Sequence, residues 1–262
     1  MMRFNSRYGH RAVLCRYAGI PDQPVPVIIP HGIYGRAGIC GAERDVPDLP
    51  VLSYPAYRDV DYERAGYTVI PCASPFVYAL LMHPVPEATK GTLYFVAHST
   101  PGVEARFDLQ ALLDDIEELP GPLTLCLHPH DMDTLASPLR ARGYEVVSAG
   151  EYKTQGFLDN LIDLIGSNRH VASNAYGTHI VYALACGRPA TIVGQPVEHF
   201  SRAKGIKIPE PQTDYMGPIR EACREWHEEI TDQQRAIARD YLRADAVLSP
   251  EAMRSVLTGG TL

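Results

Sequence analysis

Short apolar runs alternate with amphipathic segments through the middle of the chain. Consecutive apolar positions, as in strands buried on both faces, occupy 91–97, 122–127, 144–148 and 190–193. Apolar residues at helical spacing occupy 108–119, 133–142 and 156–166. Strands that alternate with helices in this way predict a parallel, doubly wound sheet of four or five strands over 91–194.

The stretch 169–194 predicts a complete strand, helix and strand. Ser173 and Asn174 follow the first strand, and both are good helix N-caps, while Gly177 permits a close backbone approach. Gly187 ends the helix. A helix that begins with exposed Ser, Asn and Thr side chains offers free N–H donors and a positive dipole end to a phosphate. An ordinary capped helix explains the same residues equally well.

The first part of the chain has fewer and shorter elements. A strand or short helix is predicted at 11–17, strands at 25–29, 51–54 and 67–71, a helix at 56–65 and a linker at 83–90. We therefore expect a small N-terminal α/β domain at 1–88 and a Rossmann-like domain at 89–205. Helices at 206–262 would pack across both.

Composition narrows the class of protein. The chain of 262 residues has a net charge of −7 and a pI near 5.8, which argues against a general nucleic-acid binder. It has no apolar run of about 20 residues for a bilayer span, and its first residues lack the apolar core of a signal peptide. Its six cysteines occur singly, which argues against zinc and predicts a reduced, cytoplasmic protein.

Three polar loops follow predicted strands of the second domain. They contain His98, Ser99 and Thr100; His128, Pro129 and His130; and Ser173, Asn174, Gly177, Thr178 and His179. Loops at the carboxyl ends of parallel strands share one edge, so we expect them to form one crevice. Their basic side chains are all histidines, so a phosphate would be held by imidazole, hydroxyl and backbone N–H groups. His98 and His179 are equally compatible with loop hydrogen bonding and solvent contact.

Sequence fingerprints of other phosphate sites are absent. The chain contains neither a Gly-x-Gly-x-x-Gly nor a Walker sequence, so hydride transfer to a dinucleotide and ATP hydrolysis lack their signatures. Asp131 and Asp133 form an Asp-x-Asp pair, but Asp133 is explained more simply as a helix cap, and we expect no metal and no cofactor.

Pro30, His31 and Gly32 end the predicted strand at 25–29. His31 is a candidate general base, because an ordinary imidazole titrates near pH 6.5 and is available in its neutral form at pH 7. Alternatively, His31 hydrogen-bonds the Gly-rich loop that follows. Tyr34 and Arg36 lie in that loop and would reach a second substrate or form plain loop surface.

The order of these motifs resembles the donor half of the GT-B glycosyltransferases. The similarity is greatest to bacterial capsule glycosyltransferases, polysialyltransferases and CDP-glycerol glycerophosphotransferases, and it covers about 25–200. It rests on His128-Pro129, on Ser173 and Asn174, and on Gly177-Thr178 before a helix followed by Gly187, Arg188 and Pro189. The resemblance implies a GT-B-like α/β fold, two Rossmann-like domains facing a cleft, the N-terminal one reduced.

The resemblance also implies roles for these residues. His128, Ser173, Asn174 and Thr178 would bind the donor phosphates, and His31 with Gly32 would face the acceptor. The implied protein is a metal-independent glycosyltransferase of cell-surface or secondary-metabolite glycan assembly. Its donor would be a nucleotide-activated sugar or glycerophosphate with a pyrimidine base, and its acceptor a glycan or small molecule. Alternatives are a nucleotide-sugar 2-epimerase-like enzyme, with Asp108, Glu151 or Asp159 near the sugar, and a non-catalytic nucleotide-sugar-binding relative.

Overall fold

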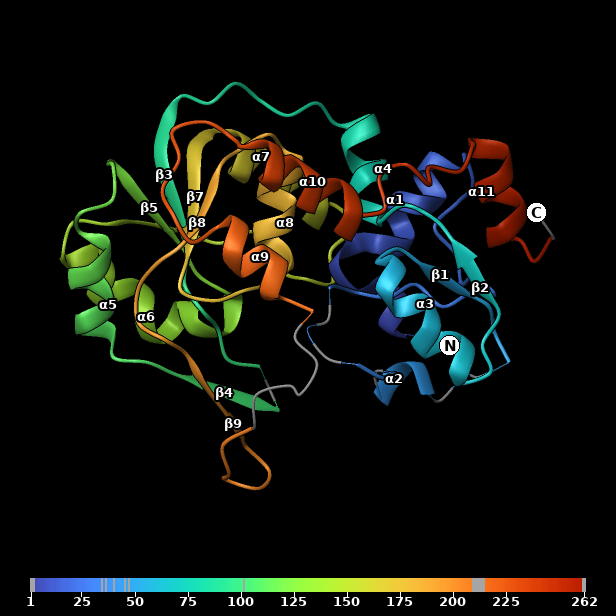
Figure 1. Ribbon diagram of the computed structural model, residues 1–262, viewed down its shortest axis with the longest axis horizontal. Helices are drawn as coiled ribbons and strands as arrows, with labels where there is room; N and C mark the ends of the chain where they lie inside the picture. The colour runs from blue at the N-terminus through green and yellow to red at the C-terminus, as the bar shows by residue number, and fades with distance from the viewer. Residues whose placement is uncertain are drawn as a thin grey trace.

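The computed structural model describes residues 3–33, 35, 37–39, 41–44, 46, 48–100, 102–208 and 215–260. Its largest element is a five-stranded parallel sheet in the order β6-β5-β3-β7-β8 (Figure 1). The strands are β3 (Lys90–Phe95), β5 (Leu123–Cys126), β6 (Glu145–Val147), β7 (Asn168–Ser173) and β8 (Ala190–Ile192). The first strand of this sheet in sequence, β3, is its central strand. The chain then adds β5 and β6 on one side and β7 and β8 on the other. The predicted α/β class with a parallel sheet is confirmed.

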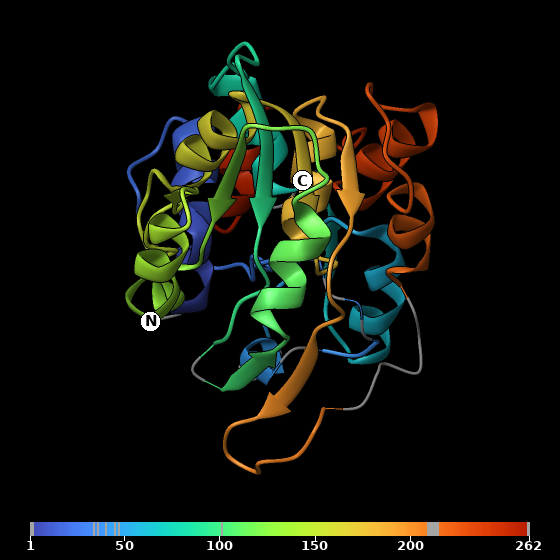
Figure 2. The ribbon, with the colours of Figure 1, turned by 90° about the vertical axis from the view of Figure 1, so that its left-hand side faces the viewer.

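Helices cover both faces of this sheet, because successive residues of a strand point to opposite sides. They are α5 (Leu109–Ile116), α6 (Pro129–Ala141), α7 (Phe157–Gly166) and α8 (Thr178–Ala185). Tyr94 and Leu125 share one core with α5 and α6, whereas Leu93 and Val171 share another with α7 and α8. Figures 1 and 2 show the two helical layers on either side of the sheet.

The N-terminal part contains a second, two-stranded parallel sheet of β1 (Val51–Ser53) and β2 (Val69–Pro71). Its helical elements are η1 (Arg3–Gly9), α1 (His10–Tyr17), α2 (Gly41–Arg44), η2 (Ala56–Arg58), α3 (Asp59–Arg64) and α4 (Pro75–Met82). The prediction of a strand at 25–29 is wrong, because Ile28 forms a single bridge to Val51. Pro26 has no N–H with which to extend a ladder there.

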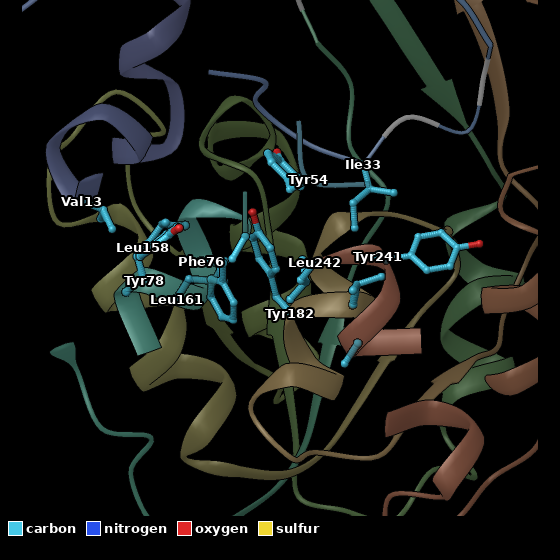
Figure 3. Close-up of a cluster of buried hydrophobic side chains, with 14 of the residues drawn as sticks. Val13, Ile33, Tyr54, Phe76, Tyr78, Leu158, Leu161, Tyr182, Tyr241 and Leu242 are labelled. Atoms are coloured by element: carbon cyan, nitrogen blue, oxygen red, sulfur yellow. The ribbon is translucent and has the colours of Figure 1, made fainter. Parts of the chain in front are cut away.

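The two sheets are separate, but the parts that carry them share one apolar core. The ring of Phe76 in α4 stacks on that of Tyr182 in α8, with centroids 3.8 Å apart and planes 6° apart. Figure 3 shows these rings beside Tyr78, Leu158 and Leu161, all of one buried cluster. The predicted domain boundaries stay predictions.

The C-terminal helices return to both parts of the chain. They are α9 (Gly217–Ala222), α10 (Asp232–Tyr241) and α11 (Pro250–Leu257). Helix α10 packs against α8 of the large sheet, whereas α11 packs against α1 of the N-terminal part. Between these helices, the Arg243 guanidinium donates to the Asp59 carboxylate at 2.8 Å.

An antiparallel ribbon that the sequence pattern does not predict extends from the large sheet. It pairs β4 (Val103–Arg106), which follows the first strand of that sheet in sequence, with β9 (Glu198–Ser201), which follows its last (Figures 1 and 2). The ribbon brings the segment after β9 back to the loop after β3. Over the described residues, the helices are too short or too polar to cross a membrane.

Candidate functional site

The loops after β3, β7 and β8 are tied together at the carboxyl edge of the large sheet. Asn174 Oδ1 accepts the backbone N–H of Ala97 at 2.9 Å, and Asn174 Nδ2 donates to the carbonyl of Gln195 at 3.4 Å. The chain changes its winding direction between β3 and β7, which is where open α/β sheets bind ligands. Two of the three loops predicted to share this edge, those after β3 and β7, are therefore joined there, together with the loop after β8.

Ser173 and Asn174 differ from the prediction in their environment. Both side chains are buried rather than exposed at a helix start. Helix α8 begins at Thr178 with Gly177 as its N-cap, and Ser173 Oγ accepts the N–H of Ala175 at 3.1 Å. Because their oxygens satisfy backbone groups, these two residues shape the loop from within.

Three histidines gather where β3 and β5 end. The rings of His98 and His128 stack with centroids 4.5 Å apart and planes 9° apart, and His130 lies 4.9 Å from His128. His128 is the N-cap of α6, which begins four residues earlier than predicted, with Pro129 as its first residue. His128 Nδ1 accepts the N–H of His130 at 3.2 Å. The neutral ring of His128 therefore carries its proton on Nε2, where it can be donated to a ligand.

The imidazoles of His98 and His128 are neutral at pH 7. Burial, followed by the neighbouring His98 and His130, lowers the pKa of His128 from 6.5 to about 4. Desolvation and then His199 and His130 also lower the pKa of His98, although its side chain is exposed. An anion here would receive N–H donors rather than imidazolium charge.

A hollow of about 340 Å³ opens beside the cluster, lined by Ser99, Thr100, His130, Asp131 and Arg202. Arg202 supplies a permanent positive charge, which corrects the expectation that histidines alone are basic here. Its Nε donates to the carbonyl of Thr100 at 3.1 Å, and its backbone N–H donates to that of Gly102 at 3.1 Å. The hydroxyls of Ser99 and Thr100 accept backbone N–H groups and each retains its own hydrogen to donate.

Asp131 is the acidic member of this hollow. Burial raises the pKa of its carboxyl, while His128 and the backbone of Ser99 act in the opposite direction. The described part of the chain contains no group of three or more His, Cys, Asp or Glu side chains placed to hold a metal ion. Of the carboxylates considered for an epimerase, Asp108 caps α5 and Asp159 pairs with Arg16 at 2.7 Å. Glu151 acts electrostatically on His128.

The His31 loop lies directly against the start of α8. The backbone N–H of Ile33 donates to Thr178 Oγ1 at 3.0 Å. A Cβ on Gly32 would lie 3.1 Å from the same oxygen, so glycine permits the close approach. The structure therefore brings His31, Gly32 and Thr178 together, although 145 residues separate the two hydrogen-bonded partners.

His31 is held from the other side by the N-terminal segment. Arg7 Nη1 lies 3.3 Å from His31 Nε2, and the Tyr8 ring stacks over the imidazole at 6.3 Å. A guanidinium can only donate, so Nε2 is the acceptor and the proton of the neutral ring resides on Nδ1. Burial, and then Arg7, lowers the pKa of His31 to about 4, so the expected unperturbed value is wrong.

His179 is half-buried among these loops, with Nε2 turned inward. Its ring packs on Phe95 at 4.9 Å, and Nε2 is buried without a hydrogen-bond partner among the described residues. Burial, followed by His98, lowers the pKa of His179 to about 3. A Cβ at Gly177 would lie 2.9 Å from this ring, so Gly177 makes room for His179.

Two tyrosines join the His31 loop to the histidine cluster. Tyr8 lies 5.8 Å from Tyr152, and Tyr152 lies 6.2 Å from His128, between ring centroids. The backbone N–H of Tyr8 also donates to the carbonyl of Tyr152. A row of rings thus runs from His31 to His128.

Sequence reasoning missed four residues of this arrangement. The missed residues are Arg7, Tyr8, Tyr152 and Arg202, none of which belongs to a motif, although Tyr152 comes four residues after the predicted strand at 144–148. A weak signal exists for Arg202, because 199–208 contains three Lys or Arg residues and no acidic one. Tyr34 and Arg36, assigned to the acceptor side, lie outside the described residues.

No protein-family model matches the chain, and no curated protein matches its sequence. Among solved structures, the chain is similar to that of the wall teichoic acid polymerase TagF, in a variant soaked with CDPG. The TM-score is 0.41 at 12% sequence identity, and the match covers 88% of this chain and 64% of the TagF chain. The chain therefore spans less than two thirds of the length of TagF.

Proposed function

We propose that this chain is a metal-independent transferase of the GT-B type, which uses a nucleotide-activated sugar or glycerophosphate donor. The observation that carries the proposal is that two groups lie against loops at the carboxyl edge of the large sheet. One group is the hollow with Arg202 and His130 beside His128, and the other is the His31 loop on Thr178. Phosphate-binding chemistry and a candidate base thus face the same edge of the sheet.

The donor phosphates would occupy the hollow beside the histidines. Arg202 would supply charge, while His128 Nε2–H and the hydroxyls of Ser99 and Thr100 would donate hydrogen bonds. Donors fixed in this way stabilise the charge that develops on a leaving phosphate. The pyrimidine base and the role in glycan assembly follow from the resemblance in the sequence and belong to the proposal.

In the proposed reaction, an acceptor hydroxyl attacks the anomeric carbon of the sugar, or the phosphorus of the glycerophosphoryl group. The bond to the nucleotide phosphate breaks and its electron pair leaves with that phosphate. The hydroxyl proton passes to Nε2 of His31. General-base catalysis of this kind contributes about 10²–10⁴-fold.

Nucleotide affinity tests the donor site. We expect a panel of nucleoside mono- and diphosphates to raise the melting temperature, with pyrimidine nucleotides giving the largest shifts. His128→Asn keeps a side-chain acceptor for the cap of α6 but removes Nε2–H, and Arg202→Gln removes the charge. Each should weaken binding about tenfold, as expected for one lost hydrogen bond involving a charged group. Arg106→Gln, on the same ribbon outside the hollow, is the matched control.

Turnover tests the base. The assay measures the nucleotide released from UDP- and CDP-activated sugars and from CDP-glycerol when candidate acceptors are present. The rate of release should fall by about two to four orders of magnitude in His31→Ala. His31→Asn should be nearly as slow, with donor affinity retained. Normal turnover in a folded His31→Ala protein would disprove the assignment of His31.

A nucleotide-binding protein without transferase activity is the second candidate. The contact between Arg7 and His31 favours this second candidate. Nε2 of His31 already accepts a hydrogen bond from Arg7, and the pKa of His31 is low for a general base. Saturable nucleotide binding with no turnover for any donor and acceptor pair would select this candidate.

A further inference from the structure

Arg7 is a half-buried cation whose recorded partner is a neutral ring. Its guanidinium lies 3.3 Å from His31 Nε2, and it forms no ion pair with the described residues. Of the other half-buried or buried arginines that the structure describes, Arg11, Arg58 and Arg243 each face a carboxylate. Arg188 has no carboxylate partner either, but it donates to the carbonyls of Pro86 and Gly166, whereas Arg7 lies against an imidazole. A guanidinium partly removed from water and left without a counter-charge favours an incoming anion.

The backbone holds Arg7 at the boundary between the His31 loop and the large sheet. Tyr8 and Gly9 have φ values of +56° and +69°, a left-handed conformation that is costly for tyrosine. Tyr8 is retained there by its N–H bond to Tyr152, and Gly9 lies against the carbonyls of Thr154 and Gln155. The turn is therefore anchored on the large-sheet side, while the Arg7 and Tyr8 side chains lie over His31.

We propose that Arg7 is an anion-binding residue that accepts a phosphoryl group at the junction of the His31 loop and the His98–His128 cluster. A guanidinium can donate two parallel hydrogen bonds to two phosphate oxygens. This bidentate, charged interaction is stronger than a single hydrogen bond to a neutral nitrogen. The identification of the phosphoryl group as part of a donor rests on the proposed function. The anion site itself rests on the placement of Arg7.

The position of Arg7 also affects whether His31 can act as a base. In the unliganded protein the guanidinium occupies Nε2, so that nitrogen cannot take a proton from an acceptor hydroxyl. A phosphoryl group that draws the guanidinium away frees Nε2 to receive that proton. Arg7, Tyr8 and His10 are among the groups near the imidazole, and in the proposed arrangement Arg7 is the one that responds to a ligand.

The test uses inorganic pyrophosphate with protein labelled with ¹⁵N at histidine. In the wild type, we expect pyrophosphate to bind and to move the His31 Nε2 resonance as the guanidinium leaves. Arg7→Gln should weaken pyrophosphate binding about tenfold or more, and in the free protein it should shift the His31 resonances and raise the pKa of His31. Arg7→Lys keeps the positive charge but loses the paired donors of the guanidinium. Its affinity for pyrophosphate should lie between those of the wild type and Arg7→Gln. Arg64→Gln, on the exposed face of α3, is the matched control.

The outcomes separate this inference from the proposed function. Unchanged pyrophosphate affinity and unchanged His31 resonances in a folded Arg7→Gln protein would overturn the role of Arg7. In that case, loss of nucleotide affinity in Arg202→Gln and His128→Asn would still support the donor site. Conversely, if pyrophosphate binding depends on Arg7 but the protein neither binds nucleotides nor turns over any donor, the anion site is supported and the transferase function is disproved.

Discussion

Acid should destabilise this protein through His10, a buried histidine that the fold holds neutral. Its Nδ1–H donates to the carbonyl of Pro30 at 3.0 Å, and its Nε2 is buried without a hydrogen-bond partner among the described residues. Protonation would therefore place a charge where no acceptor meets it. Burial lowers the pKa of His10 to about 3, against the small raising effect of the Pro30 carbonyl.

The sign and size of the effect follow from linkage. The unfolded chain binds a proton at His10 below about pH 6.5, whereas the folded chain does not until about pH 3. The stability associated with the neutral ring is thus present above pH 6.5 and is lost as pH falls toward 3. Between about pH 7.5 and pH 5, this single group lowers the free energy of unfolding by about 2 kcal/mol.

Urea unfolding at the two pH values measures this loss, and His10→Asn is the comparison. The Asn amide can donate to Pro30 as Nδ1 does, but it does not titrate in this range. His170 is also buried with a pKa of about 3 and is unchanged in both proteins, so its contribution cancels. The wild type should lose about 2 kcal/mol more than His10→Asn on acidification. Equal pH dependence in both proteins would show that His10 titrates normally in the fold and would refute the reasoning.

Two further predictions concern the segments that hold the site together. Thr178→Val removes the acceptor of the Ile33 N–H and should lower the free energy of urea unfolding by about 1–3 kcal/mol, whereas Thr178→Ser should retain most of it. Equal losses in the two variants would mean that the hydrogen bond contributes nothing. Gly9→Ala and Gly66→Ala both place alanine at positive φ, a cost of about 1–2 kcal/mol, but a Cβ at Gly9 would also lie 2.7 Å from the carbonyl oxygen of Gln155. Gly9→Ala should therefore give the lower thermal melting temperature, and matching melts would contradict the close contact.

Most elements of the large sheet could be predicted from the sequence because their signals are local. Apolar runs ended by glycine or proline mark β3, β5, β6 and β8, and each is observed within a few residues of its predicted place. The sequence predicts that α6 begins at Asp133, because His128-Pro129 directly follows a strand and is typical of a loop. Proline is well suited to the first turn of a helix, and His128 supplies the cap in place of an Asp.

The missed elements depend on partners that are distant in sequence. Strand β4 is short and half-exposed and pairs with β9, almost a hundred residues away, so neither strand has a strong pattern of its own. That pairing is also what brings Arg202 to the loop after β3. At 25–29 the sequence predicts a strand where the structure has a single bridge. An apolar run is necessary for a buried strand, but it does not supply the partner strand.

By itself, the sequence determined the α/β class, the alternation of strands and helices along the chain over the large sheet, and the polar loops that follow its strands. Helical periodicity, caps and breakers act over a few residues, so they can be recognised in one dimension. Only the tertiary structure decided that Ser173 and Asn174 are buried, that Thr178 holds the His31 loop and that Arg7 lies on His31. Desolvation and charge interactions depend on distances in space, and residues far apart in the chain set them.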